Sequence, residues 1–263
     1  MKDQQPYEIV PLLLEYADNA LILGHRNSEW TGHGPVLEQD IAVTNIALDL
    51  IGQARLLYQY AAEQMNGSHG TDQAMPVTED SLAYLRDAWD FKNCLLVEQD
   101  NGDWAKTILR QFFFSCFQGL LYEKLIQSKD SRLAAIAEKS LKECKYHIRW
   151  SSEWVIRLGC GTEESLRRMK NALDALWKFT GELFVPTDYE RSAALAGIAP
   201  DPASLYDSWM IRTKHVLDEA MLIMPDKNAH TLTGGKKGVH TEHLGFILTE
   251  MQFLQRAYPG CEW

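Results

Sequence analysis

The sequence predicts an all-α protein, and three observations lead to that prediction. Apolar residues recur with a helical period of 3.6 in one segment after another, while the alternation typical of strands is almost absent. Two helix pairs, residues 7–64 and 104–158, look like the halves of a four-helix bundle. No linker or low-complexity segment divides the chain. We therefore expect one domain over residues 1–263, with a core bundle at about 7–158 and additional helices at about 162–257.

The first helix pair begins with a helix over residues 7–25. A turn rich in Gly, Trp and His leads to the second helix, residues 38–63, whose apolar residues point in nearly every direction around the helix axis. That pattern predicts a central, buried helix. Asn45, Asp49 and Gln53 follow one another at intervals of four residues, so they form one polar line along this helix.

Capping residues and helix breakers place the remaining helices at residues 78–89, 104–127, 131–158, 162–180, 203–221 and 240–256. The side chains of Thr78, Asp103 and Asp130 can accept N–H groups of a first helical turn. Gly159 ends one helix, and Pro202 is tolerated where a helix begins. Residues 66–76 are predicted to form a loop, and another loop with a short helical turn follows residue 180.

Composition and charge exclude several classes of function. The chain has 263 residues, 46% of them hydrophobic, and a formal net charge of -10. That charge argues against binding to nucleic acid or to anionic membranes. The N-terminal sequence has no apolar core of the signal-peptide type, and no apolar run is long enough to span a bilayer. The five cysteines are odd in number and form no C-x-x-C pair, which predicts reduced thiols in a cytoplasmic protein.

A buried carboxylate needs a cation or a hydrogen-bonding partner, and helical bundles often supply one by binding two metal ions. Such bundles use a Glu-x-x-His pair on each of two helices. Here Asp49 is followed three residues later by Gly52, and Glu143 by Tyr146. None of the eight histidines has an acidic residue three positions before it. The sequence therefore predicts that neither metal-binding pair is present.

The other two helices of such a site should each contribute a carboxylate. The first helix offers Glu15 or Asp18, but the helix after Asp103 carries no acid before Glu123. We therefore interpret Asp49 and Glu143 as buried acids bound to neighbouring Arg, Tyr or amide groups. The alternative is a di-iron oxygenase or metal-binding bundle with an unusual ligand set: Asp49, Glu143, His147 and an acid of the first helix.

Four long segments resemble the C component of the bacterial phenylacetyl-CoA epoxidases, the multicomponent ring 1,2-epoxidases of aerobic phenylacetate breakdown. They are ALDLIGQAR (47–55), NCLLVEQDNGDWA (93–105), KECKYHIRWSSEWVIRLGCGTEES (142–165) and TGGKKGVHTEHLGFILTEMQFLQRAYPG (233–260). The resemblance spans nearly the whole chain, with the segments in the same order. It implies a ferritin-like fold with a four-helix core and additional C-terminal helices.

The same resemblance implies a role without chemistry of its own. In this family a homologous catalytic alpha subunit holds the di-iron centre, and a reductase with an iron–sulfur cluster and a flavin draws electrons from NADPH. Together they use O2 to epoxidise phenylacetyl-CoA, while the C component supports the catalytic subunit. The chain is then expected to have no catalytic residue and no cofactor. By motif position, Asp49, Gly52, Glu143 and Tyr146 are expected to be remnants of two metal-binding pairs.

A non-catalytic bundle acts through its surface, and two features suggest where. The helix over residues 104–127 carries aromatic and aliphatic side chains on more than one face, which suggests a partner helix. The alternative is a central helix surrounded by its own chain. The Gly-rich loop before residue 240 contains Lys236 and Lys237, which could contact a phosphate group of CoA at a subunit boundary; an ordinary solvated turn is the other interpretation.

The sequence leaves two further hypotheses, a metal-binding pair of histidines and an acyl-CoA-binding function. His240 and His243, one helical turn apart, could bind a metal ion, but the sequence shows no third ligand, so capping and packing roles are favoured. A plain acyl-CoA-binding protein is a third class of function, and it would require the isolated chain to bind the thioester.

Overall fold

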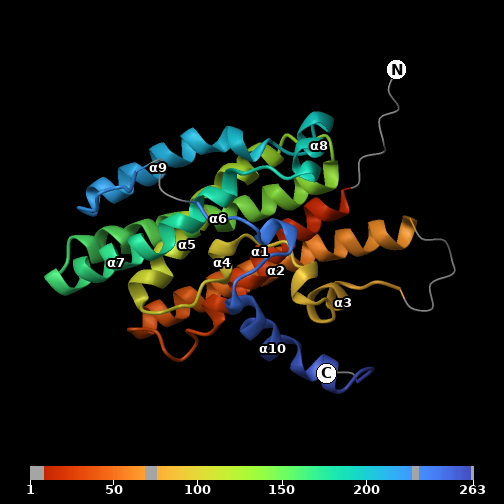
Figure 1. Cartoon of the computed structure of the whole chain (residues 1–263), viewed down its shortest axis with the longest axis horizontal. Helices are drawn as coiled ribbons and strands as arrows, with labels where there is room; N and C mark the ends of the chain where they lie inside the picture. The colour runs from red at the N-terminus through yellow and green to blue at the C-terminus, as the bar shows by residue number, and fades with distance from the viewer. Residues whose placement is uncertain (1–8, 69–75, 227–230, 262–263) are drawn as a thin grey trace.

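Helices form the secondary structure of the residues that the computed structural model describes, 9–68, 76–226 and 231–261 (Figure 1). None of these residues belongs to a strand. The α-helices are α1 Val10–Ser28, α2 Leu37–Ser68, α3 Glu79–Tyr84, α4 Leu95–Glu98, α5 Trp104–Leu125, α6 Ser131–Gly159, α7 Glu163–Thr180, α8 Asp188–Ala196, α9 Tyr206–Glu219 and α10 Glu242–Ala257. Single 3-10 turns are η1 Ala88–Asp90, η2 Gly181–Phe184, η3 Pro202–Leu205 and η4 Gly235–Lys237. The predicted all-α, ferritin-like bundle is confirmed.

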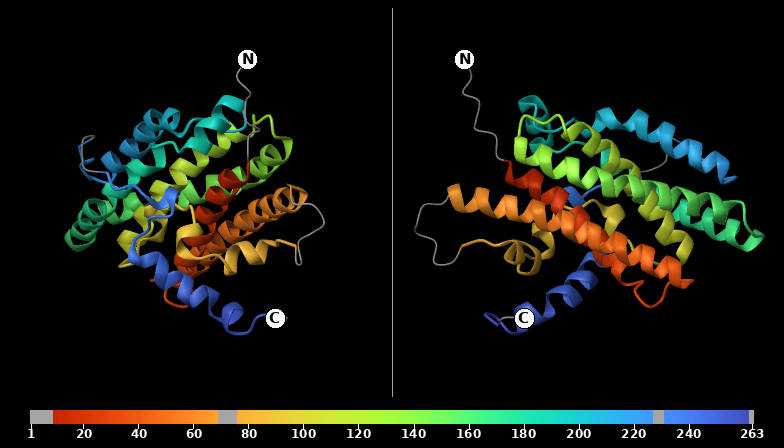
Figure 2. Two further views of the ribbon diagram at one scale, coloured as in Figure 1. Left: turned by 45° about the vertical axis from the view of Figure 1, so that its right-hand side comes forward. Right: turned by 180° about the vertical axis from the view of Figure 1, so that it is seen from behind.

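Two helical hairpins make the four-helix core. α1 packs along α2, α5 packs along α6, and α2 also contacts α6 (Figures 1 and 2). α7 and α9 lie against α5 and α6, while α8 contacts α1. α10 extends away from the body of the molecule, and its contacts are with α3, α4 and η1 (Figure 1).

The central helix is α5, which corrects the prediction that residues 38–63 form it. Every residue of α5 from Thr107 to Tyr122 is buried, because α6, α7 and α9 cover the faces that α1 and α4 leave open. The indole N–H of Trp209 in α9 donates to the carbonyl of Phe113, 3.0 Å away. The apolar side chains on every face of α5 are therefore covered by helices of the same chain. The interpretation that they contact a helix of a partner was wrong.

α2 is amphipathic instead of buried on all sides. Ile41 and Leu48 expose 52% and 62% of their surface, whereas Ile46, Leu50 and Leu57 are fully buried. The apolar periodicity of α2 was judged from hydrophobicity alone, and hydrophobicity does not distinguish a side chain in the core from one on an exposed apolar face.

Several helix starts follow from the capping residues. The side chains of Thr78, Asp103, Asp130 and Thr162 each accept a backbone N–H group of the first turn. Four helices differ from the prediction by three residues or more at an end: α1 spans Val10–Ser28, α2 continues to Ser68, α3 ends at Tyr84, and α9 begins only after the turn η3. Residues 69–75 of the predicted loop 66–76 lie outside the described residues.

Of the described helices, none combines the length and apolar character needed to cross a membrane.

Candidate functional site

The space between α2, α5 and α6 contains amide, hydroxyl and thiol groups that bond to one another. Gln53 of α2 donates its amide N–H to Glu143 Oε2 at 2.8 Å and accepts a hydrogen bond from Gln118 Nε2 at 3.1 Å. The thiol of Cys144 donates to Gln118 Oε1 at 3.2 Å, and Tyr122 Oη donates to Gln53 Oε1 at 3.4 Å. Glu143 is thus bound to an amide, as predicted, but Glu143 and Asp49 are only half-buried, so the prediction that both acids are buried was wrong.

Asp49 pairs with His147 at the same seam between α2 and α6. The distance from Asp49 Oδ2 to His147 Nε2 is 3.0 Å. The histidine is fully buried, but the carboxylate keeps 36% of its surface exposed. Within the described part of the chain, no group of three or more His, Cys, Asp or Glu side chains could hold a metal ion.

The structure corrects the orientation expected for two of the predicted remnant positions. Gly52 and Tyr146 are exposed on the outside of α2 and α6. The residues that face the helical interior follow one position later, at Gln53 and His147, which are both buried. Spacings of three and of four residues both place side chains near each other on a helix, so the sequence alone could not decide between them.

Glu15 of α1 belongs to a buried cluster of titratable side chains that come from distant parts of the sequence. Lys236 Nζ lies 3.3 Å from Glu15 Oε1 and 2.8 Å from Glu190 Oε1. Burial raises the pKa of Glu15 to about 8, with Lys236 acting to lower it and Glu190 to raise it further. The second oxygen of Glu15, Oε2, is buried and accepts no hydrogen bond from the described residues. Burial of the carboxyl group therefore favours the protonated form of Glu15.

This cluster changes the interpretation of the two lysines in the Gly-rich loop. Lys236 exposes only 4% of its surface and is paired with carboxylates, so it cannot reach a ligand in solution as predicted. Lys237 is exposed and lines a pocket of about 240 Å³ together with Thr233, Gly234 and Pro186. A contact with CoA phosphate stays a prediction for Lys237.

Asp18, the other acid of α1, is also fully engaged. Tyr58 Oη donates to Asp18 Oδ1 at 2.5 Å, and the backbone N–H of Lys92 donates to Oδ2 at 2.7 Å. The guanidinium of Arg86 binds both oxygens of the same carboxylate and lies over the ring of Phe91. Both acids that α1 could contribute to a metal site are thus held by cations from other elements.

A third buried acid, Glu98 of α4, fixes the start of α10. Its oxygens accept hydrogen bonds from the backbone N–H and hydroxyl of Thr241, at 2.7 and 2.8 Å, and from Asn93 Nδ2 at 2.9 Å. His240 Nδ1 lies 2.8 Å from Glu98 and Nε2 lies 3.0 Å from the carbonyl of Phe91. Burial acts to lower the pKa of His240, but these hydrogen bonds outweigh it and raise that pKa. His243 faces Asp100 instead, so the two histidines do not form a metal-binding pair.

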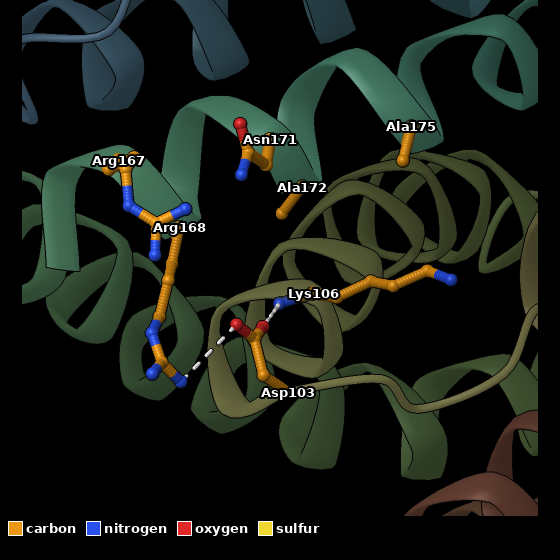
Figure 3. Close-up of a pocket in the computed structure, with 7 residues that line it drawn as sticks. All are labelled: Asp103, Lys106, Arg167, Arg168, Asn171, Ala172 and Ala175. Carbon is orange, nitrogen blue, oxygen red and sulfur yellow. Dashed lines mark hydrogen bonds and ion pairs between the residues drawn. The ribbon is translucent and has the colours of Figure 1, made fainter. Parts of the chain in front are cut away.

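A pocket of about 360 Å³ lies between the N-terminal turn of α5 and α7 (Figure 3). Figure 3 shows Arg168 reaching from α7 towards Asp103, the N-cap of α5, at 3.6 Å. Lys106 is paired with Asp100, and both Arg167 and Arg168 with Glu164. Each basic side chain of this pocket is already paired with an acidic one. The pocket therefore has no unpaired positive charge that would attract an anionic ligand.

Sequence reasoning missed several of these residues. Glu190 had a visible signal, because Thr187 and Glu190 form a capping box that begins α8. Arg86 and Glu98 had none, because their partners lie 68 and 142 residues away in the chain.

Comparison with known proteins agrees with the geometry. The whole chain, residues 1–263, matches the model of a family described as phenylacetic acid catabolic protein. A protein of Escherichia coli (strain K12), named as the C component of 1,2-phenylacetyl-CoA epoxidase, is 44% identical over 256 residues. These residues cover 97% of this chain and 99% of that relative. The match therefore includes both the four-helix core and the helices after it, and it confirms the resemblance stated above.

Proposed function

Because the chain belongs to the phenylacetic acid catabolic protein family, we propose that it is the non-catalytic structural subunit of a phenylacetyl-CoA epoxidase. In this proposal it pairs with the homologous catalytic alpha subunit and stabilises it. The observation that carries the proposal is the chemistry between the core helices, where Gln53, Gln118, Cys144 and Tyr122 bond to one another.

A di-iron site in a bundle takes carboxylates from all four helices and a histidine from each of two. Here both acids of α1 are bound to Lys236 and Arg86, and α5 has no acid among its buried residues. The carboxylate of Glu143 is bound to an amide. These contacts favour the structural role over an oxygenase with an unusual ligand set. In the proposed complex the iron and the O2 chemistry belong to the catalytic subunit, and the reductase supplies electrons through its iron–sulfur cluster and flavin.

One ligand contact is part of the proposal. Lys237 would bind a phosphate group of phenylacetyl-CoA where the two subunits meet. The exposure of its side chain and the pocket beside it support this assignment. A lysine ammonium group is a suitable point charge for phosphate.

Co-expression with an affinity-tagged catalytic subunit from the same organism tests the proposed function. We expect the untagged chain to elute with the tagged subunit as one complex in size-exclusion chromatography. We also expect ring epoxidation to require both subunits as well as the reductase. A catalytic subunit that is equally soluble and active without this chain would contradict the proposal, as would separate elution of the two.

A further inference from the structure

α10 projects from the body of the molecule and is attached near its start (Figure 1). Its buried side chains all lie before residue 253: Leu244, Ile247, Leu248 and Gln252. Phe253 and Tyr258, nearer its end, are exposed. A helix with so few buried contacts opens locally at a lower free energy than the core does. The contacts at its start therefore decide how firmly α10 is held.

His240 joins the start of α10 to two other elements. Its side chain is only 4% exposed, and Nδ1 lies 2.8 Å from Glu98 Oε2 in α4. On the other side of the ring, Nε2 lies 3.0 Å from the carbonyl oxygen of Phe91, the residue that follows η1. The chain before His240 runs against the same segment, because a Cβ atom added to Gly238 would lie 2.2 Å from the carbonyl oxygen of Trp89. The ring is therefore held between α4 and the end of η1.

Both partners of the ring only accept hydrogen bonds. A main-chain carbonyl has no proton to donate, and Glu98 also receives N–H and O–H groups from Asn93 and Thr241, as an ionised carboxylate does. A neutral imidazole has one N–H donor and one lone pair, so it satisfies only one of the two contacts. The imidazolium ion donates from both nitrogens. The geometry therefore selects the charged ring.

The charges around the ring favour the same form. Burial acts to lower the pKa of His240, but the hydrogen bonds to Glu98 and Phe91 and the negative charges of Glu98 and Asp18 raise it above the ordinary value of 6.5. Charged groups of the adjoining elements have partners of their own: Arg86 with Asp18, Arg26 with Glu29, Lys92 with the ring of Tyr189, Lys236 with Glu190, His243 with Asp100, and Asp90 with the backbone N–H of Asp87. His240 is therefore the cation that balances Glu98.

We infer that His240 is held as an imidazolium ion and acts as a proton-dependent latch, which fastens the start of α10 to η1 and α4 and loosens when the ring loses its second proton. The remaining proton stays on Nδ1, next to the carboxylate, so the contact with Phe91 is the one that is lost. Because the folded-state pKa is raised, the latch contributes its full stability below about pH 6.5 and loses it as the pH rises through the folded-state pKa. The inference does not depend on the proposed function, because it concerns this chain alone.

Hydrogen–deuterium exchange of the full chain at pH 6 and pH 9 tests the latch. Protection factors, which correct for the pH dependence of the intrinsic exchange rate, are compared over residues 242–257 in the wild type and in His240→Gln. Glutamine stays neutral and cannot donate to both partners. We expect the ratio of wild-type to variant protection to fall between pH 6 and pH 9, by about tenfold for each unit by which the pKa of His240 is raised.

His243→Gln is the matched control, because His243 lies one helical turn away and pairs with Asp100. Its protection over α10 should keep the pH dependence of the wild type. The carboxyl group of Glu15 is present in all three chains, so its own pH dependence cancels from the ratios. A ratio for His240→Gln that stays the same at both pH values overturns the inference, as does a ratio that falls only for His243→Gln.

A second measurement needs no substitution. In the wild-type chain with 15N-labelled histidine, the chemical shifts of the ring nitrogens report the protonation of His240 directly. We expect both nitrogens to be protonated at pH 6 and Nε2 to lose its proton at a pH above 6.5, the ordinary value. A ring with an unprotonated nitrogen at pH 6 overturns the inference, even if His240→Gln does not fold.

Discussion

Replacing Lys236 with methionine is expected to destabilise the folded chain by about 3–5 kcal/mol, the usual effect of removing one partner of a buried ion pair. Lys236 is the cation that lies between Glu15 and Glu190, and all three side chains are at most 4% exposed. Methionine fills a similar volume but leaves the buried carboxylate of Glu190 without its cation. A buried charge without a partner is far more costly than a buried apolar group.

Lys237→Met is the matched control for this prediction, because it removes the neighbouring, exposed ammonium group. We expect its free energy of unfolding to stay within about 0.5 kcal/mol of the wild-type value. Chemical denaturation followed by circular dichroism measures both variants. Equal stability of Lys236→Met and Lys237→Met would show that the buried cluster does not hold η4 against α1 and α8.

Glu15→Gln is expected to make the stability of the chain less dependent on pH. The folded-state pKa of Glu15 is about 8, above the ordinary value of 4.5, because the carboxyl group is buried. The folded state therefore keeps a proton that the unfolded state loses, and stability declines as the pH rises from about 4.5 to about 8. Each unit of pKa difference corresponds to about 1.4 kcal/mol, so the decline is on the order of 4 kcal/mol.

Thermal unfolding of Glu15→Gln at pH 5 and pH 8 checks this sign. Glutamine is neutral at both pH values, so we expect the variant to exceed the wild type in melting temperature at pH 8, by roughly 10 °C, and to differ little at pH 5. Exposed Glu250→Gln serves as the control and should follow the wild-type profile. A wild-type chain that gains stability between pH 5 and pH 8 relative to Glu15→Gln would contradict the protonated state of Glu15.

The helices could be predicted from the sequence where local signals define them. Asp103, Asp130 and Thr162 act as caps in the structure, and the ends of α5, α6 and α7 lie within a few residues of the predicted ends. α4 and α8 were missed. α4 has only four residues, and its position depends on contacts of Glu98 with residues near the start of α10. Local sequence carries no information about such contacts.

The candidate site could be predicted only in part. The absence of Glu-x-x-His pairs could be predicted directly from the sequence, and so could the polar line that contains Asp49 and Gln53. The partners of Glu15 and Asp18 were not, because Lys236 and Arg86 come close only when the chain folds. The choice between α2 and α5 as the central helix also depends on α7 and α9, which cover α5 from outside the four-helix core.

Iron analysis of the separated subunits tests the central claim most directly. The complex is expressed with added iron, its subunits are separated under non-denaturing conditions, and the metal content of each is measured by mass spectrometry. The account predicts about two iron atoms per catalytic subunit, as a di-iron bundle requires, and far less than one per copy of this chain. Near-stoichiometric iron in this chain would contradict the claim that its core is structural.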